Sequence, residues 1–114
     1  MHELSLVMSV VKTISNLCVQ NKWKRVLRVT LKVGHFRQIE PEIFAFVYSS
    51  AIIGTSLEGS EISIIEMPII FKCHSCNTNS DTEELRFVCP NCGSVDVDLI
   101  SGMEFIIESI EIGG

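Results

Sequence analysis

Two Cys-x-x-Cys pairs constrain the fold of this 114-residue chain more than any other feature. Cys73 and Cys76 form the first pair and Cys89 and Cys92 the second, with twelve residues between the pairs. Each pair can direct two sulfurs at one point, and two pairs brought together complete the tetrahedral thiolate shell that structural zinc prefers. Gly93, directly after the second pair, permits the backbone turn by which an amide approaches sulfur. The spacing therefore predicts a structural zinc site.

Three other interpretations of the four cysteines are a rubredoxin-like iron site, a redox dithiol pair and two disulfides. A closed set of four sulfurs and an odd total of five cysteines favour reduced thiolates over the last two. His74, inside the first pair, is expected to be an exposed spacer, with a role as an alternative ligand left open. Cys18 lies alone in an apolar helical pattern, which is typical of a small buried hydrophobe.

The residues around the cysteines contain few large apolar side chains. Ordering about 30 residues costs about 1.5 kcal/mol for each, which so few apolar contacts cannot offset. A bound metal worth roughly 10–16 kcal/mol could supply the difference. We therefore predict a zinc-binding module over residues 71–101, inserted into a domain made of residues 1–70 and 102–114.

The remaining segments indicate an α+β domain with two helices and three strands. Apolar residues recur every three or four positions in the helical segments and alternate in the strands. Helices are predicted at 3–20 and 41–53, and strands at 25–33, 60–67 and 103–112. Pro41 suits the first turn of the second helix, and Gly54 suits its end. The aromatic residues Trp23, Phe36, Phe44 and Phe46 are expected in the core rather than as a platform for stacking bases.

Charge is distributed unevenly along the chain. Residues 1–40 hold seven basic and two acidic side chains, whereas residues 41–114 hold two basic and twelve acidic ones. The acidic majority would repel a phosphate backbone, so a nucleic acid is not an expected partner. No apolar stretch reaches the roughly 18 to 20 residues that a membrane span needs. Residues 1–17 lack the basic start of a signal peptide, so a cytoplasmic protein that keeps its N-terminus is expected.

Met1-His2-Glu3 is a second candidate metal site. A bulky second residue should leave Met1 and its free α-amine in place. The amine, the following amide nitrogens and the His2 imidazole can close adjacent chelate rings around a metal that accepts four nitrogens in a plane. Ni(II) and Cu(II) have that preference, and zinc does not. On spacing alone, a solvated histidine is the commoner interpretation of His2, and His35 is expected to be a loop residue rather than a ligand.

Taken together, several motifs are similar to those of the HypA/HybF family, nickel metallochaperones for hydrogenase maturation. They are Met1-His2-Glu3-Leu4-Ser5, Val33-Gly34 followed by Ile39-Glu40-Pro41-Glu42, Gly54-Thr55 with Leu57-Glu58-Gly59, and the two Cys-x-x-Cys pairs, in that order. The resemblance implies two helices on a three-stranded sheet, with a four-cysteine zinc-ribbon module inserted before the final strand. It implies Ni(II), as transient cargo, at Met1, His2 and Glu3, and structural Zn(II) at Cys73, Cys76, Cys89 and Cys92.

The resemblance implies that the chain binds and delivers Ni(II) and catalyses no reaction. The sequence shows no nucleophile with a matched base and no phosphate loop, in agreement with that expectation. The implied partners are the nickel-handling GTPase HypB and the hydrogenase large-subunit precursor, with urease left open as a client. Alternatives are a zinc-ribbon interaction module of transcription or RNA machinery, which the acidic half of the chain disfavours, and an iron–thiolate electron carrier. Where the family is expected to have an acidic residue after Gly34, this chain has His35, which is therefore a further candidate for the nickel site.

Overall fold

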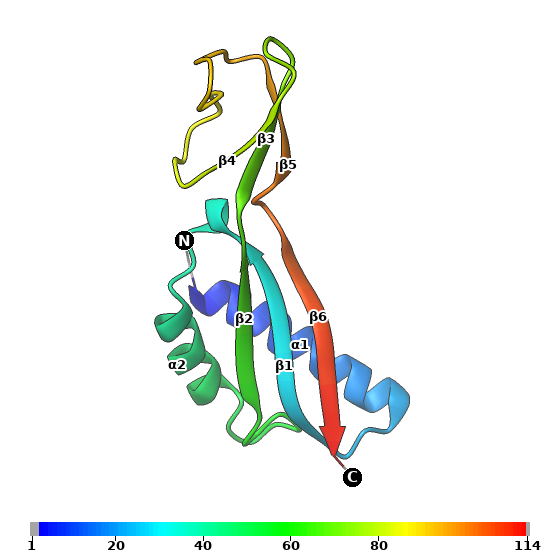
Figure 1. The fold of residues 1–114 in the computed structure, drawn as a ribbon. Coiled ribbons are helices and arrows are strands. Elements are labelled where there is room, and N and C mark those ends of the chain that lie inside the picture. The colour runs from blue at the N-terminus through cyan, green and yellow to red at the C-terminus, as the bar shows by residue number, and fades with distance from the viewer. Residues whose placement is uncertain (1–2, 114) are drawn as a thin grey trace. The chain divides into compact units, whose positions relative to one another are not determined.

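Two helices and three long strands form where the hydrophobic periodicity predicts them (Figure 1). The structure is a computed structural model that describes residues 3–113. The elements are α1 (Glu3–Asn21), β1 (Arg25–Gly34), α2 (Pro41–Ala51), β2 (Glu61–Met67) and β6 (Phe105–Gly113). The first and last residues of these five elements differ from the predicted ones by at most two positions. The predicted α+β class is confirmed.

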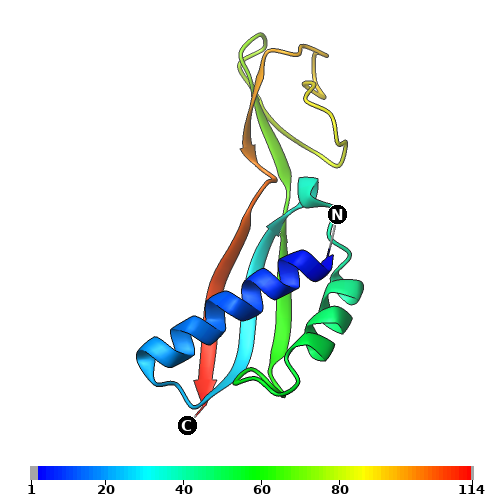
Figure 2. The same cartoon turned by 180° about the vertical axis from the view of Figure 1, so that it is seen from behind.

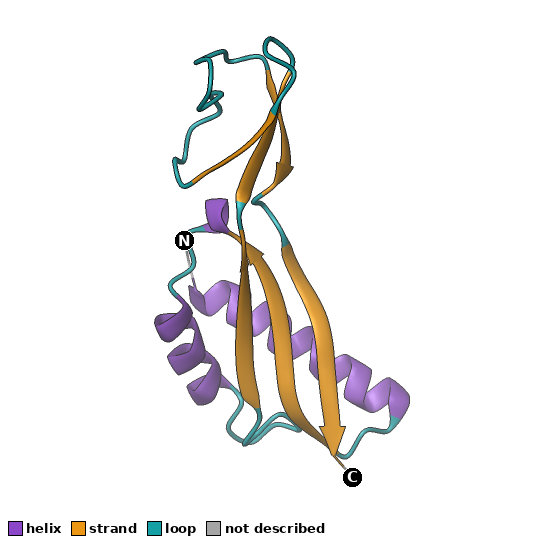
Figure 3. Cartoon of the chain, in the orientation of Figure 1, coloured by secondary structure: helices purple, strands orange, loops and turns teal. Residues whose placement is uncertain are grey.

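Four short elements were not predicted: the 3-10 helix η1 (His35–Arg37) and the strands β3 (Ile69–Cys73), β4 (Asn79–Thr82) and β5 (Val97–Ser101). Of these, β4 reads Asn-Ser-Asp-Thr and carries no apolar alternation, so periodicity could not reveal it. The three strands form one antiparallel sheet in the order β4-β3-β5, in which Ile69 pairs with Thr82 and Cys73 with Val97. Figure 3 separates these strands from the long loop between β4 and β5, which carries the second cysteine pair.

The chain divides into two compact units. The first comprises Met1–Leu31, Ile39–Ile65 and Ile106–Gly114, and the second comprises Lys32–Gln38 and Glu66–Phe105. The predicted zinc module, residues 71–101, lies wholly within the second unit. This unit also contains the segment Lys32–Gln38, which belongs to the first third of the chain. The predicted division into a nickel-binding and a zinc-binding part concerns function, and it stays a prediction.

The core of the first unit lies between the helices and one face of a sheet with the strand order β2-β1-β6. Figure 2 shows α1 crossing in front of this sheet and α2 beside β2, and Figure 1 shows the sheet from its other side. Most of its buried side chains come from α1, β1 and α2: Val7, Val10, Val11, Ile14, Cys18, Val26, Val29, Leu31, Phe44 and Tyr48. Ile39, Ile52 and Leu57, from the segments beside α2, are also buried. The Tyr48 hydroxyl is satisfied by Ser60 Oγ at 2.7 Å, so burial of this ring leaves no polar atom without a partner.

The expectation that Phe46 belongs to the core is wrong, because its side chain is 73% exposed. Phe44, Tyr48 and Ile52 follow one another at intervals of four residues and form the buried side of α2 and the turn after it. Phe46 therefore lies on the opposite side of the helix. Phe44 is buried as predicted, and Trp23 is half-buried.

Gly34, the last residue of β1, lies in the second unit and allows a close approach of two backbone segments. A Cβ atom on Gly34 would lie closer than 3.0 Å to the carbonyl carbon and oxygen of Gly102. The Gly34 N–H donates to the Glu104 carbonyl at 2.7 Å, and the Phe36 N–H donates to the Gly102 carbonyl at 2.9 Å. The Glu104 carboxylate in turn accepts hydrogen bonds from the Gly102 N–H and the Ser101 hydroxyl. No side chain fits between these segments.

Replacing Gly34 by alanine is expected to destabilise the protein by about 3 kcal/mol, because backbone atoms of Gly102 cannot move aside as a flexible side chain would. The φ of Gly34 is −72°, which suits alanine, so the loss isolates the steric clash. Gly54→Ala is the matched control: Gly54 has φ +82° and an added Cβ would meet no atom within 4 Å, so the change should cost about 1 kcal/mol from backbone strain alone. Urea denaturation at saturating metal measures both. Equal midpoints for Gly34→Ala and the parent would contradict the close approach.

Candidate metal centre

The four predicted cysteines meet at one place in the second unit. Their sulfurs all lie within 4.8 Å of one another. Cys73 Sγ is 3.6 Å from Cys92 Sγ, and Cys76 Sγ is 3.7 Å from Cys89 Sγ. A regular tetrahedron with metal–sulfur bonds of about 2.3 Å has sulfur separations of about 3.8 Å. Two of the six sulfur separations therefore match those around a tetrahedral metal, and the other four lie within 4.8 Å.

Each pair is shaped by its own backbone turn. The Cys76 N–H points to Cys73 Sγ, and the Cys92 N–H points to Cys89 Sγ, both at 3.4 Å. Gly93 has φ +78°, the turn conformation expected of it, but its N–H donates to the Cys89 carbonyl at 2.9 Å and not to a sulfur. The amide that points to a sulfur of this pair is that of Cys92. Strand β3 delivers Cys73 to the site, and the loop after β4 delivers Cys89.

Two polar contacts to Cys76 were not predicted. Thr78 Oγ1 lies 3.0 Å from Cys76 Sγ, and Asn91 Nδ2 donates to the same sulfur at 3.7 Å. Hydrogen bonds from these two side chains lower the pKa of the Cys76 thiol to about 6. The only sequence signal for them is their position inside or beside a Cys-x-x-Cys pair, which does not reveal which side chains turn inward.

Cys92 shows the opposite behaviour. A backbone hydrogen bond at Ser94 lowers the pKa of its thiol, but the sulfur of Cys73, desolvation, and the sulfurs of Cys89 and Cys76 together raise it to about 12. Four close sulfurs cannot all carry negative charge unless a cation compensates them. A divalent metal bound by the four sulfurs would supply that compensation. With all four corners occupied by sulfur, no open position remains for a substrate, so this centre can hold a metal but has no place to activate a reactant.

The structure describes two histidines, His35 and His74. His74 Nε2 is 2.7 Å from Asp98 Oδ2, and both side chains are exposed. Within residues 3–113, the four cysteines are the one group of three or more His, Cys, Asp or Glu side chains close enough to share a metal. His74 and His35 are therefore in no such group in the described structure. Met1 and His2 of the predicted nickel site lie outside the described residues, and Glu3 is the first residue of α1.

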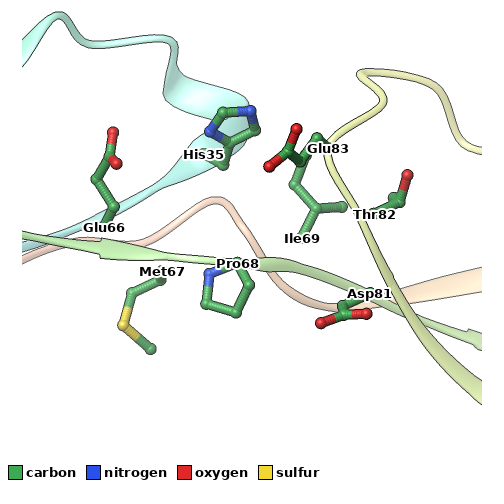
Figure 4. A pocket seen from close by; sticks show the side chains of 8 residues that line it. All are labelled: His35, Glu66, Met67, Pro68, Ile69, Asp81, Thr82 and Glu83. Atoms are coloured by element: carbon green, nitrogen blue, oxygen red, sulfur yellow. The ribbon is translucent and has the colours of Figure 1, made fainter.

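A pocket of about 450 Å³ lies beside the β2–β3 junction of the second unit (Figure 4). Its lining residues are His35, Glu66, Met67, Pro68, Ile69, Asp81, Thr82 and Glu83. His35 comes from η1, whereas Asp81, Thr82 and Glu83 come from the end of β4 and the loop that leads to Cys89. His35 was predicted to be a loop residue. In the structure it begins the short 3-10 helix η1, and its side chain lines this pocket.

These features define a small α+β protein with a helix-covered sheet in one unit and a four-cysteine candidate metal site in the other. The family profile described as "Hydrogenase/urease nickel incorporation, metallochaperone, hypA" matches residues 1–112. The chain belongs to this HypA family, which consists of metallochaperones rather than enzymes. Neither helix of the described part is long and apolar enough to cross a bilayer.

Relatives agree with this assignment along the whole chain. The hydrogenase maturation factor HypA of Aquifex aeolicus is 31% identical over 112 residues, which cover 98% of this chain and 97% of that protein. That of Trichormus variabilis is 36% identical over 112 residues, covering 98% and 96%. The solution structure of the Ni metallochaperone HypA from Helicobacter pylori is 21% identical, covers 98% of this chain and 97% of that one, and has a TM-score of 0.69. This last similarity shows a shared fold.

Proposed function

We propose that this chain binds Ni(II) through the Met1 α-amine, the His2 backbone and imidazole and the Glu3 backbone nitrogen, and delivers it during maturation of [NiFe]-hydrogenase. The family match over residues 1–112 carries this proposal, because it includes the Met1-His2-Glu3 start and describes nickel incorporation. Four nitrogens in a plane suit Ni(II), whereas four thiolates suit Zn(II). The chain thus offers two sets of donor atoms that prefer different metals, nitrogens for Ni(II) and thiolates for Zn(II).

Zn(II) is the resident ion of this proposal, held by Cys73, Cys76, Cys89 and Cys92. Support comes from the sulfur separations of 3.6 and 3.7 Å, close to those of a tetrahedral zinc–thiolate centre. The zinc-binding module is residues 71–101, and the nickel-binding domain is residues 1–70 and 102–114. The donors of the two ions are then separate in sequence, so that cargo can leave without loss of the structural ion.

The proposed partners are those of cytoplasmic hydrogenase maturation. They are the GTPase HypB and the hydrogenase large-subunit precursor, with urease as a second client. The family description, which names both hydrogenase and urease, supports the two destinations. The relatives are named hydrogenase maturation factors.

Nickel titration of the untagged protein, followed by metal analysis, tests the proposal. We expect one zinc per chain before and after the titration, and one additional nickel with the yellow absorbance of planar Ni(II) bound to nitrogen. Two results would overturn the assignment: no nickel uptake by the zinc-loaded protein, or nickel that displaces zinc and shows thiolate-to-nickel charge-transfer bands. A red iron–thiolate chromophore in the purified protein would instead favour the electron-carrier alternative.

A further inference from the structure

Three phenylalanine rings form a cluster inside the second unit, next to the cysteines. Phe36 stacks on Phe87 with a centroid distance of 5.1 Å and an interplanar angle of 14°. Phe36 also meets Phe71 edge-on at 6.2 Å, and Phe71 and Phe87 are 5.6 Å apart. Each ring thus contacts the other two, in distances typical of favourable aromatic pairs.

Two of the three rings are tied to the metal centre by the same sequence offset. Phe71 lies two residues before Cys73, and Phe87 lies two residues before Cys89, so each ring precedes the first cysteine of a pair. Phe71 is held in strand β3 and is 1% exposed. Phe87 is in a loop without helix or strand and is 55% exposed, so burial does little to fix it. The position of the Phe87 ring therefore depends on how the loop ending at Cys89 is held.

Phe36 is different because it comes from the first third of the chain. It belongs to the segment Lys32–Gln38, which is continuous with the first seven residues of strand β1. Its neighbour His35 lines the pocket described above, together with Glu83 at the start of the Phe87 loop. A change in the contact of Phe36 with Phe87 would therefore alter the segment at the end of β1 and the position of His35 in the lining of this pocket.

We propose that Phe36 senses whether the cysteine cluster holds a metal, because a metal that joins Cys73 to Cys89 also brings Phe71 and Phe87 together as the surface on which Phe36 packs. Metal binding then stabilises the packing of the Phe36 ring, and with it the turn at His35–Arg37. By linkage, packing of Phe36 must strengthen metal binding by the same factor. This inference rests on metal binding by the four cysteines and not on nickel binding at the N-terminus, so the two can fail separately.

Amide hydrogen exchange of the zinc-loaded protein tests the first half of the inference. In Phe87→Ala we expect the Phe36 amide to exchange about 3- to 10-fold faster, the factor that corresponds to one lost aromatic pair. The Cys76 and Cys92 amides, which point to sulfur, should exchange as in the parent and so show that the metal centre is intact. Leu85→Ala, in the same loop at a 42% exposed site, is the matched control and should leave all three amides unchanged.

Zinc competition with a chromophoric chelator tests the reciprocal half. Phe36→Ala and Phe87→Ala should each lower zinc affinity about 3- to 10-fold, and the double variant should lose little more than the worse single one. An unchanged zinc affinity in Phe36→Ala would overturn the inference. So would fully additive losses, or a Phe36 amide that exchanges at the parent rate in Phe87→Ala.

Discussion

Replacing Cys92 by alanine is expected to release the metal and unfold the cysteine-bearing part of the second unit, while α1 and α2 stay folded. Cys92 is exposed, so its truncation removes little packing, and the loss comes from the metal. A structural zinc contributes roughly 10–16 kcal/mol of folding free energy, more than a module with so few apolar contacts can replace. Amide signals of residues 69–101 should collapse to the random-coil range, with far-UV circular dichroism retaining the helical signal.

The first unit should survive because its core is independent of the cysteines. The buried faces of α1 and α2 pack with β1 through Ile14, Phe44, Tyr48 and Val29, all at 0% exposure. Cys18→Ala is the matched control, because Cys18 is buried in α1 and remote in sequence from the two pairs. It should keep one zinc and the dispersed spectrum of residues 69–101. Dispersed signals for these residues in metal-free Cys92→Ala would show that the metal is not what orders them.

The long elements could be predicted because their periodicity is local. The stripe of Leu4, Val7, Val11, Ile14 and Cys18 lies within one helix, and four of its five residues are buried as the pattern indicates, whereas Leu4, in the first turn, is 60% exposed. Strand β4 could not be predicted, since its four polar residues become a strand through pairing with β3. Local propensity carries no information about such a partner.

The same distinction applies to the metal centre. The four sulfurs come together as the spacing predicts, because each Cys-x-x-Cys turn is a local structure. The contacts of Thr78 and Asn91 with Cys76 depend on how two separate turns meet, which no local pattern contains. Membership of Lys32–Gln38 in the second unit is also a long-range property. Gly34 is the residue of this segment that indicates a close contact. The structure shows that the contact is with the backbone of Gly102.

His2→Ala is expected to abolish nickel binding and to leave one zinc per chain. A planar set of four nitrogens needs the free Met1 amine and deprotonated backbone amides, and the imidazole is the anchor that lets nickel displace the amide protons near neutral pH. Without this anchor the chelate should not form at ordinary metal concentrations. The fold should be unchanged, because residue 2 precedes the apolar stripe of α1, whose first buried residue is Val7. Nickel titration followed at the absorbance of planar Ni(II) measures the loss.

His35→Ala and His74→Ala are the matched controls, since each removes one imidazole from the second unit and leaves Met1-His2-Glu3 intact. Both should bind nickel as the parent does. One extra residue before Met1 should act nearly like His2→Ala, because it turns the amine into an amide and shifts the imidazole out of position. If His2→Ala binds nickel as tightly as the parent, the cargo site lies elsewhere. In that case, the control variant that fails to bind nickel would show which histidine is the ligand, because an imidazole is a suitable side-chain ligand for nickel.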